Sequence, residues 1–153
     1  AYYIVGNDDY IDCNSRNHYL AEPVEIGGYT FVPFEYTPIS PFNTARELSE
    51  EELEQELNCL HTDDNTVIIA HGPPYGMLDV LLNTGESVGG SSIRNFIIEH
   101  SPLAWACGHI HESPGADMLS NTLVVNCTTD YYDSKLCGYI VDLESFDCEE
   151  VCI

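Results

Sequence analysis

Basic residues are scarce in this sequence. Four Lys and Arg residues stand against 26 Asp and Glu residues, which gives a formal net charge of −22 at pH 7. Four basic side chains can neutralise only a few phosphate groups. The sequence therefore disfavours nucleic acids and anionic membranes as partners. So large a charge also repels itself, and molar salt screens the repulsion by shortening the Debye length to about 3 Å. The composition favours a salt-rich cytoplasm, as in a halophile, with an ordinary acidic cytoplasmic protein as the alternative.

Two further patterns are missing. The sequence has no apolar run near the roughly 20 residues that cross a bilayer, and it has no recognisable secretory leader. The seven cysteines form no Cys-x-x-Cys pair, which argues against a zinc ribbon. An odd number of cysteines in a cytoplasmic protein favours reduced thiols over a disulfide framework. Cys107 and Cys127 lie in apolar runs, and we expect both to be buried.

What remains is the composition of a globular protein. Hydrophobic residues make up 44% of the 153 residues, which predicts a single domain over residues 1–153. Ser49 and Glu52 match a capping box and predict a helix from Ser49 to His61. A second helix is expected from Ser91 or Ser92 to the residues before Pro102. Strands are predicted at residues 2–5, 24–26, 29–36, 66–70, 103–107, 122–127, 138–143 and 148–153. This order of elements indicates an α/β fold.

Three of the predicted strands end in a glycine-bearing turn that carries metal-binding side chains. The first delivers Asn7 with two aspartates, the strand at 66–70 delivers His71, and the strand at 103–107 delivers His109 and His111. Because sites in α/β sheets form beyond the carboxyl ends of the strands, we expect these turns to gather at one edge. Imidazole and amide oxygen ligands suit Mn, Fe, Zn or Co. The sequence therefore predicts a metal centre.

The same residues carry a family resemblance. The stretches Gly6-Asn7-Asp8-Asp9, Ala70-His71-Gly72 and Gly108-His109-Ile110-His111 resemble, in order and strand context, the motifs of the calcineurin-like metallophosphoesterase superfamily. The sequences HGPPYG and GHIHE look most similar to those of the small, single-domain bacterial and archaeal branch of this superfamily. The resemblance implies a layered β-sandwich flanked by helices, with the strands from Thr122 onward forming the second sheet.

The resemblance also implies roles for individual residues. Asn7, His71 and His109 look like ligands of one of two divalent metal ions (Mn, Fe, Zn or Co), and His111 like a ligand of the other. Asp8 stands where many members have a histidine that assists the leaving group, so it is the candidate catalytic residue or a hydrogen-bond partner. The family's Asp-x-His and Gly-Asp motifs are absent from the six residues ahead of Asn7. We therefore expect an N-terminally truncated chain whose site is completed by residues upstream.

The implied function is metal-dependent hydrolysis of a phosphomonoester or phosphodiester, with a small-molecule or nucleotide substrate. This chain alone is expected to have little activity, and an exposed sheet edge at residues 2–5 predicts self-association into a homo-oligomer. One alternative is a non-catalytic remnant that acts as a binding module. Another is a histidine-based metal store or sensor, which would bind metal without hydrolysing aryl phosphates.

The remaining polar residues receive less specific interpretations. His18, His61 and His100 lack such context and are expected at the surface. Glu112 either orients a neighbouring histidine or is simply exposed. The glutamates at 50–52, 54 and 56 are expected to form a solvated helix face. The stretch 89–92, Gly-Gly-Ser-Ser, resembles an anion-binding helix start but lacks a P-loop lysine, so a flexible connector capped by serine is favoured.

Overall fold

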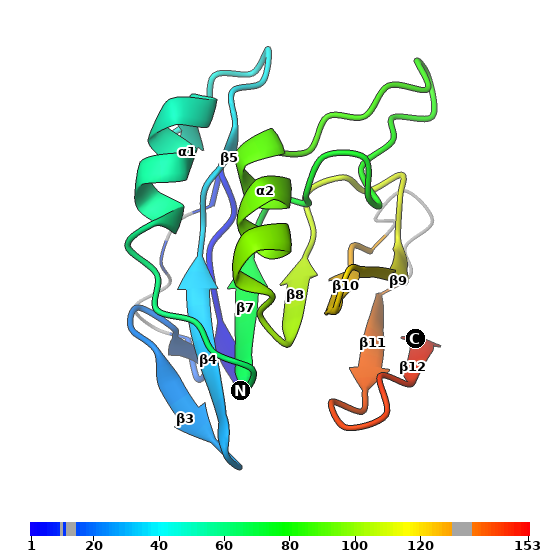
Figure 1. The fold of residues 1–153 in the computed structure, drawn as a ribbon. Helices are drawn as coiled ribbons and strands as arrows, with labels where there is room; N and C mark the ends of the chain where they lie inside the picture. The colour runs from blue at the N-terminus through cyan, green and yellow to red at the C-terminus, as the bar shows by residue number, and fades with distance from the viewer. Residues whose placement is uncertain (10, 12–14, 130–135) are drawn as a thin grey trace.

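A six-stranded mixed sheet forms the centre of the molecule in the computed structural model, which describes residues 1–9, 11, 15–129 and 136–153 (Figure 1). The strand order is β3-β4-β7-β8-β10-β9. Strands β4, β7, β8 and β10 run parallel to one another, and β3 and β9 are antiparallel edges. Their bounds are β3 Val24–Ile26, β4 Tyr29–Phe34, β7 Thr66–Ala70, β8 Ala104–Cys107, β9 Gly115–Leu119 and β10 Thr122–Asn126. The predicted α/β class is confirmed.

The hairpin between β3 and β4 follows from its turn residues. Gly27 and Gly28 have φ values of 63° and 88°, a pair that a two-residue hairpin turn requires and that glycine adopts without strain. Ile26 consequently pairs with Tyr29 across the turn. The predicted strand at 24–26 is confirmed, and the strand predicted at 29–36 ends at Phe34.

Two helices lie side by side on one face of the sheet (Figure 1). They are α1 (Glu50–Leu57) and α2 (Ser91–His100). The capping box is present, because Ser49 accepts a hydrogen bond from the backbone N–H of Glu52 and the Glu52 carboxylate binds the Ser49 N–H. Helix α1 ends four residues before the predicted His61. The core on this face contains the helix residues Leu53, Leu57, Ile93, Phe96 and Ile97 and the strand residues Ile68, Trp105 and Val124.

A two-stranded ribbon packs near the opposite face of the sheet. It consists of β11 (Cys137–Val141) and β12 (Cys148–Cys152). Tyr139 and Val141 of β11 pack against Val67 and Val125, which alternate along their strands with the residues that face the helices. The prediction that the second sheet starts at Thr122 is wrong. Strand β10 instead pairs with β8 on one side and β9 on the other. Its five residues are all buried, which suits an interior strand of the main sheet.

The N-terminal segment forms a small parallel sheet of its own. Strand β1 (Tyr2–Tyr3) pairs with β2 (His18–Tyr19), so the predicted strand at 2–5 is shorter than expected and one of its edges is covered. A second small sheet joins β5 (Thr37–Pro38) to β6 (Glu47–Leu48). The expected self-association at residues 2–5 stays a prediction.

The cysteines differ from the sequence-based expectation. Cys137 and Cys152 form a disulfide, whereas reduced thiols were predicted throughout. The two residues face each other directly in the β11–β12 register, and that register is not visible in their spacing of 15 residues. Cys107 is buried as expected, but Cys127 is exposed because it follows the last residue of β10. Cys13 lies outside the described residues.

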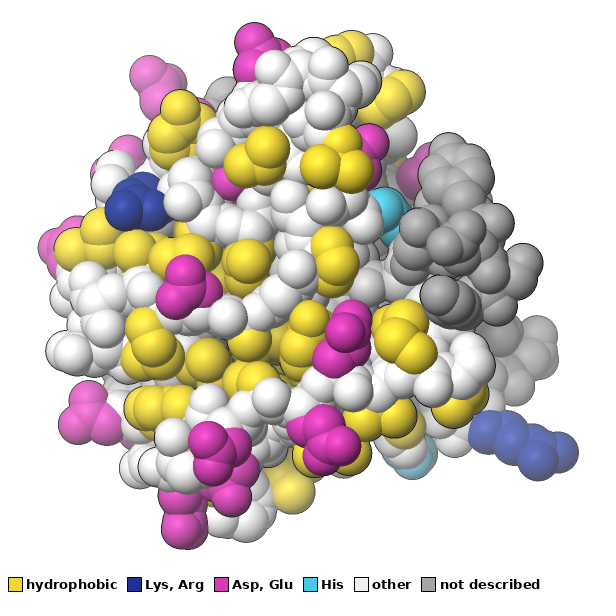
Figure 2. All heavy atoms as spheres, turned by 90° about the vertical axis from the view of Figure 1, so that its right-hand side faces the viewer, with side chains coloured by type: hydrophobic (Ala, Val, Ile, Leu, Met, Phe, Trp, Pro, Cys, Tyr) yellow, Lys and Arg dark blue, Asp and Glu magenta, His cyan; other side chains and the backbone are white. Residues whose placement is uncertain are grey.

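On the face shown in Figure 2, hydrophobic side chains gather over the middle, acidic side chains lie among and around them, and basic side chains lie at the margins. Along the described residues, no helix is both long enough and apolar enough to cross a membrane.

Candidate metal centre

His71 stands on a backbone that is held from both sides. The residue follows β7, its N–H donates to the carbonyl of Phe34 in β4 at 2.9 Å, and its own carbonyl accepts from Gly108 at 3.0 Å. The indole Nε1 of the fully buried Trp105 donates to the carbonyl of the next residue, Gly72, at 3.1 Å. These bonds extend the hydrogen-bonding pattern of the sheet beyond the end of β7. They fix the position of the His71 backbone, from which the imidazole side chain projects.

The turn after His71 is pinned against the start of α2. Gly90 donates to the carbonyl of Pro73 at 3.0 Å, and Tyr75 donates to the carbonyl of Gly90 at 3.0 Å. A Cβ on Gly89 would lie 2.7 Å from the Pro73 and Pro74 backbone, so only glycine allows this approach. The predicted flexible connector at residues 89–92 is therefore wrong, because these glycines make close backbone contact.

The N-terminus of α2 binds an anion from within the chain. The backbone N–H groups of Ser91 and Ser92 donate to the two carboxylate oxygens of Glu50 at 3.0 and 2.7 Å, and the Ser92 hydroxyl also donates to it. A carboxylate is stabilised at this end of a helix dipole. Glu50 is thus not simply part of a solvated helix face, and α2 has no serine cap because its N-cap is Gly90.

Asn7 and His71 meet although 64 residues separate them. The imidazole Nε2 donates to the side-chain oxygen Oδ1 of Asn7 at 2.8 Å. The Asn7 amide is oriented in turn by Thr44, which accepts a hydrogen bond from Nδ2 at 2.5 Å. A Cβ on Gly6 would lie 2.8 Å from His71 Cε1, so glycine at position 6 makes room for the ring.

His109 follows β8, the strand next to β7, and its ring contacts that of His71. The ring centroids are 4.7 Å apart with an interplanar angle of 65°. The φ value of His109 is 70°, a left-handed conformation that a non-glycine residue adopts only at a cost. Backbone strain of this kind gathers at functional sites, so the conformation is independent support for interest in this residue.

His111 is exposed and is held by the segment that follows β10. Its Nδ1 donates to the carbonyl oxygen of Thr129 at 2.9 Å, and in that tautomer Nε2 carries the lone pair that a metal would need. A positive charge on His111 would lower the pKa of both His71 and His109. His111 is therefore close enough to interact electrostatically with both rings. Glu112, beside it, accepts a hydrogen bond from the backbone of Leu82 instead of binding a histidine.

Asp8 and Asp9 border a pocket of about 350 Å³ next to Asn7. Asp8 is exposed, and Asp9 accepts a hydrogen bond from the Gly6 N–H at 2.9 Å. Arg46 lines the same pocket, and its guanidinium donates to the carbonyl oxygens of Gly6 and Asp9 at 3.1 and 2.9 Å. The pocket therefore combines the predicted catalytic Asp8 with one of the chain's few cations.

Glu47 is a site residue that the sequence did not indicate. Burial would raise the pKa of its carboxyl, but hydrogen bonds from Ser40 and Thr44 outweigh this and lower the pKa to about 2. Its charge favours protonation of His109, and the Asn7 amide lies 3.4 Å from its carboxylate. A fixed negative charge thus stands beside the histidines at neutral pH.

The half-buried His71 and His109 are held in the neutral form that metal coordination needs. Burial, with the neighbouring His109 as the next cause, lowers the pKa of His71 to about 4. Burial also lowers the pKa of His109, against the opposing effect of Glu47. Neutral imidazole is the ligand form of histidine, so these environments favour metal binding over protonation at pH 7.

The donor set fits one metal ion better than two. Octahedral cis ligands with bonds of about 2.1 Å lie about 3.0 Å apart, close to the 2.8 Å between Asn7 Oδ1 and His71 Nε2, and a metal there would replace the Nε2 proton that now joins the two atoms. His109 could supply a third donor from the adjacent strand. Among the described residues, however, no three His, Cys, Asp or Glu ligand atoms in this region lie within 4.8 Å of one another. His111 is therefore not gathered with the other two histidines into a compact ligand set.

The three other histidines conform to expectation. His18, His61 and His100 are exposed, and His100 stacks on Phe96. Tyr75 is also exposed, at 47%. No sequence signal marks Thr44, Arg46 or Glu47 as site residues, because they reach Asn7, Gly6 and Asp9 across 37 to 40 residues.

Comparison with known proteins gives relatives without an assigned activity. No family model matches the chain. The chain is 37% identical over 126 residues to the uncharacterized protein MJ1162 of Methanocaldococcus jannaschii, covering 77% of this chain and 58% of that protein. It is 29% identical over 125 residues to the UPF0046 protein K07C11.7 of Caenorhabditis elegans, covering 80% of this chain and 41% of that protein. The chain thus spans about half the length of these relatives.

Solved structures support the fold. One crystal structure superposes with a TM-score of 0.63 at 18% identity, over 84% of this chain and 51% of its own. The protein TT1561 of Thermus thermophilus superposes with a TM-score of 0.59 at 16% identity, over 88% of this chain and 58% of its own. At these identities the likeness concerns the fold alone.

Proposed function

We propose that this chain is part of a metal-dependent phosphoesterase of the calcineurin-like kind, with the layered architecture of that superfamily. The observation that carries the proposal is the meeting of Asn7, His71 and His109 at the carboxyl edge of the sheet. They come from three separate turns, and two of them follow adjacent parallel strands. An amide oxygen beside two neutral imidazoles has little structural purpose there, but it suits a divalent transition metal.

Each of these residues has a definite task in the proposed reaction. Divalent ions, when bound, would supply Lewis-acid stabilisation of the charge that develops on a phosphoryl group. Asn7, His71 and His109 would hold one ion, and His111 would contribute to a second whose other ligands lie outside this chain. Arg46 would place a positive charge beside the phosphoester in the adjoining pocket, and Asp8 would orient or protonate the leaving group.

The test compares this chain with a version extended toward the length of its relatives. Both are assayed with Mn²⁺ in high salt on bis-p-nitrophenyl phosphate and p-nitrophenyl phosphate, which report diesterase and monoesterase activity. We expect turnover by the extended protein, its loss in His71→Ala and His109→Ala, and little turnover by this chain alone. His61→Ala, at an exposed histidine away from the centre, is the matched control. No turnover by the extended protein with any of Mn²⁺, Fe²⁺, Zn²⁺ or Co²⁺ would contradict the proposal.

One observation favours a second candidate, a non-catalytic binding module. The region lacks a compact set of three His, Cys, Asp or Glu ligand atoms among the described residues, so a second ion has little to hold it. Two-metal clamping would then fail, while a single ion could still recruit an anionic ligand. Calorimetric titration separates the candidates, because the module would bind one equivalent of metal in the extended protein and the enzyme would bind two.

A further inference from the structure

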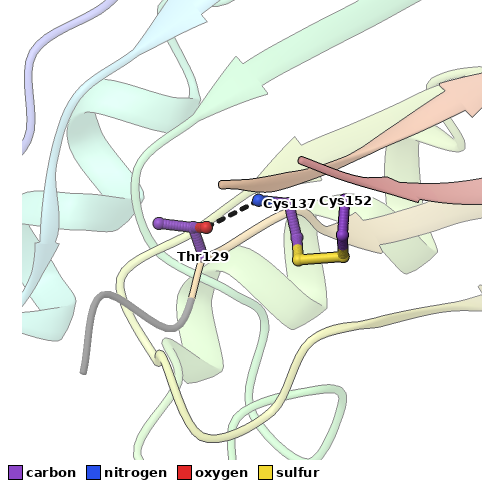
Figure 3. The surroundings of a disulfide bond; sticks show 3 residues. All are labelled: Thr129, Cys137 and Cys152. Atoms are coloured by element: carbon purple, nitrogen blue, oxygen red, sulfur yellow. Dashed lines mark hydrogen bonds between the residues drawn. A yellow bond between two sulfur atoms is a disulfide. The ribbon is translucent and has the colours of Figure 1, made fainter. Parts of the chain in front are cut away.

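The open end of the β11–β12 ribbon brings three metal-binding side chains together, on the far side of the sheet from the helices. Cys137 lies opposite Cys152, and Glu150 precedes Cys152 by two residues, so it shares the same face of β12. The two sulfur atoms and a Glu150 carboxylate oxygen all lie within 4.8 Å of one another. This is the one such group of three His, Cys, Asp or Glu residues among the described residues. Figure 3 shows the two cysteines joined as a disulfide.

The backbone holds these side chains together independently of the disulfide. Leu136 and Ile153 exchange two hydrogen bonds, of 3.1 and 2.9 Å, just beyond the cysteines. Cys137 and Cys152 therefore form a non-hydrogen-bonded pair, in which Cα atoms approach closely, here to 4.1 Å. The Cys137 N–H, which the ladder does not use, donates to the Thr129 hydroxyl at 2.7 Å (Figure 3). The ladder and this bond fix the pair whether or not the sulfurs are joined.

We propose that Cys137, Cys152 and Glu150 form a second metal site, for Zn²⁺ or a similarly thiophilic divalent cation, which is available only when the disulfide is reduced. Two thiolates bound to one Zn²⁺ with bonds of about 2.3 Å lie about 3.8 Å apart, a separation that rotation of the two side chains can supply. Glu150 gives a carboxylate as third ligand, and water completes the tetrahedron. Thiolate donors select Zn²⁺ over Mn²⁺, which sets this site apart from the histidine centre.

The gating step is ordinary thiol–disulfide exchange with a dithiol reductant. One thiolate of the reductant attacks a sulfur of the Cys137–Cys152 bond, and its second thiol resolves the mixed disulfide. Two electrons pass to the protein, which gains two thiols, and the reductant becomes a cyclic disulfide. Cation binding then releases the two thiol protons to solvent. Cys152 and Glu150 are exposed, so both the reductant and the cation can reach the site.

The site also matches features of the whole chain. The net charge of −22 raises the local concentration of divalent cations around every such group. With two thiolates and one carboxylate, the ligands carry three negative charges against the two positive charges of the ion.

The test is a Co²⁺ titration of the 153-residue protein with the disulfide intact and after reduction by a phosphine that is then removed. Thiolate ligation to Co²⁺ gives a near-ultraviolet charge-transfer band, which histidine and asparagine ligands do not give. We expect one equivalent of this signal in the reduced protein, none in the oxidised protein, and its loss when Zn²⁺ is added. Absence of the band from reduced protein overturns the proposal.

Variants assign the ligands. Cys137→Ser and Cys152→Ser should each abolish most of the band, and Glu150→Gln, which keeps both thiols, should weaken Co²⁺ binding about tenfold. Glu149→Gln on the other face of β12 and Cys148→Ser are the matched controls and should bind as the parent does. Equal affinities of Glu150→Gln and Glu149→Gln, or a full band in a protein lacking both Cys137 and Cys152, would show that the site is elsewhere.

Discussion

Replacing Gly6 by alanine should displace His71 and weaken both the fold and metal binding at the proposed centre. The added Cβ would lie 2.8 Å from His71 Cε1 and 2.9 Å from Asp9 Oδ2, closer than such atoms approach in proteins. The exposed Asp9 side chain can rotate away. The His71 ring cannot yield as easily, since its backbone is held by Phe34 and Gly108 and its Nε2 donates to Asn7.

The magnitude follows from the two contributions. Overpacking should lower the free energy of unfolding by about 1–3 kcal/mol in total. The lost hydrogen bond to Asn7 accounts for about 1 kcal/mol of this total. For a chain of this size each kcal/mol lowers the melting temperature by roughly 2–4 °C, so a decrease of about 2–12 °C is expected. Affinity for Mn²⁺ or Co²⁺ at the histidine centre should fall at least about tenfold, because a displaced imidazole no longer faces Asn7 Oδ1.

Calorimetric melting and metal titration measure both effects, and imidazole NMR signals report the His71 tautomer. Gly138→Ala is the matched control, because a Cβ there meets nothing within 4 Å and no left-handed φ is involved. The reasoning is refuted if Gly6→Ala has the same melting temperature as the parent protein and leaves the His71 signals unchanged. A similar loss in Gly138→Ala would instead indicate a general effect of alanine.

Three further predictions concern the surroundings of the centre. In the metal-free protein the pKa of His71 is about 4, below its ordinary value of 6.5, so the unfolded chain binds this proton first. Stability should therefore fall as pH drops from about 6.5 to about 4, and urea midpoints that do not change over this range would contradict the assignment. Asp79→Ala should cost about 2–4 kcal/mol in urea unfolding, because the buried carboxylate accepts two backbone N–H bonds; a loss below about 1 kcal/mol would contradict this. Trp105→Phe should cost about 1–3 kcal/mol and loosen the turn at Gly72, seen as faster amide exchange there; unchanged exchange would argue against the indole bond as an anchor.

Features of the fold with a local physical cause could be predicted from the sequence. Gly27 and Gly28 are free to adopt the positive φ values of a tight hairpin, and Ser49 with Glu52 satisfies the first turn of α1. His71 and His109 were placed at one edge because parallel neighbouring strands end on the same side. The hairpin and the helix start need no contact between distant segments, and the placement of the histidines needs only that their two strands be parallel neighbours.

Features that depend on register or long-range contact could not be predicted. The Cys137–Cys152 disulfide exists because one particular register of β11 and β12 sets the two residues opposite each other. The place of β10 inside the main sheet depends on its pairing with β8, which its apolar sequence alone does not decide. Glu50 has the sequence context of a solvated residue, and only the packing of α1 beside α2 brings its carboxylate to Ser91 and Ser92.

The centre therefore has two parts with different mechanical origins. The histidine part is an extension of the six-stranded sheet, since ladder bonds hold the backbone at His71 and Gly108. The other part, Asn7, follows β1. Among the described strands, β1 is not hydrogen-bonded into that sheet.

Side chains from the 35–47 segment join the two parts. Glu35 accepts from the Val5 N–H at 3.0 Å and pairs with Arg46 at 3.3 Å, and Arg46 donates to the carbonyl of Gly6. These charge-assisted bonds set the distance between Asn7 and His71, because they connect the N-terminal arm to the residues that follow β4. A metal bound by Asn7 and His71 would bridge the arm to the sheet directly. If the proposed metal binds there, its binding and the ordering of residues 1–9 are coupled, and each should stabilise the other by the same free energy.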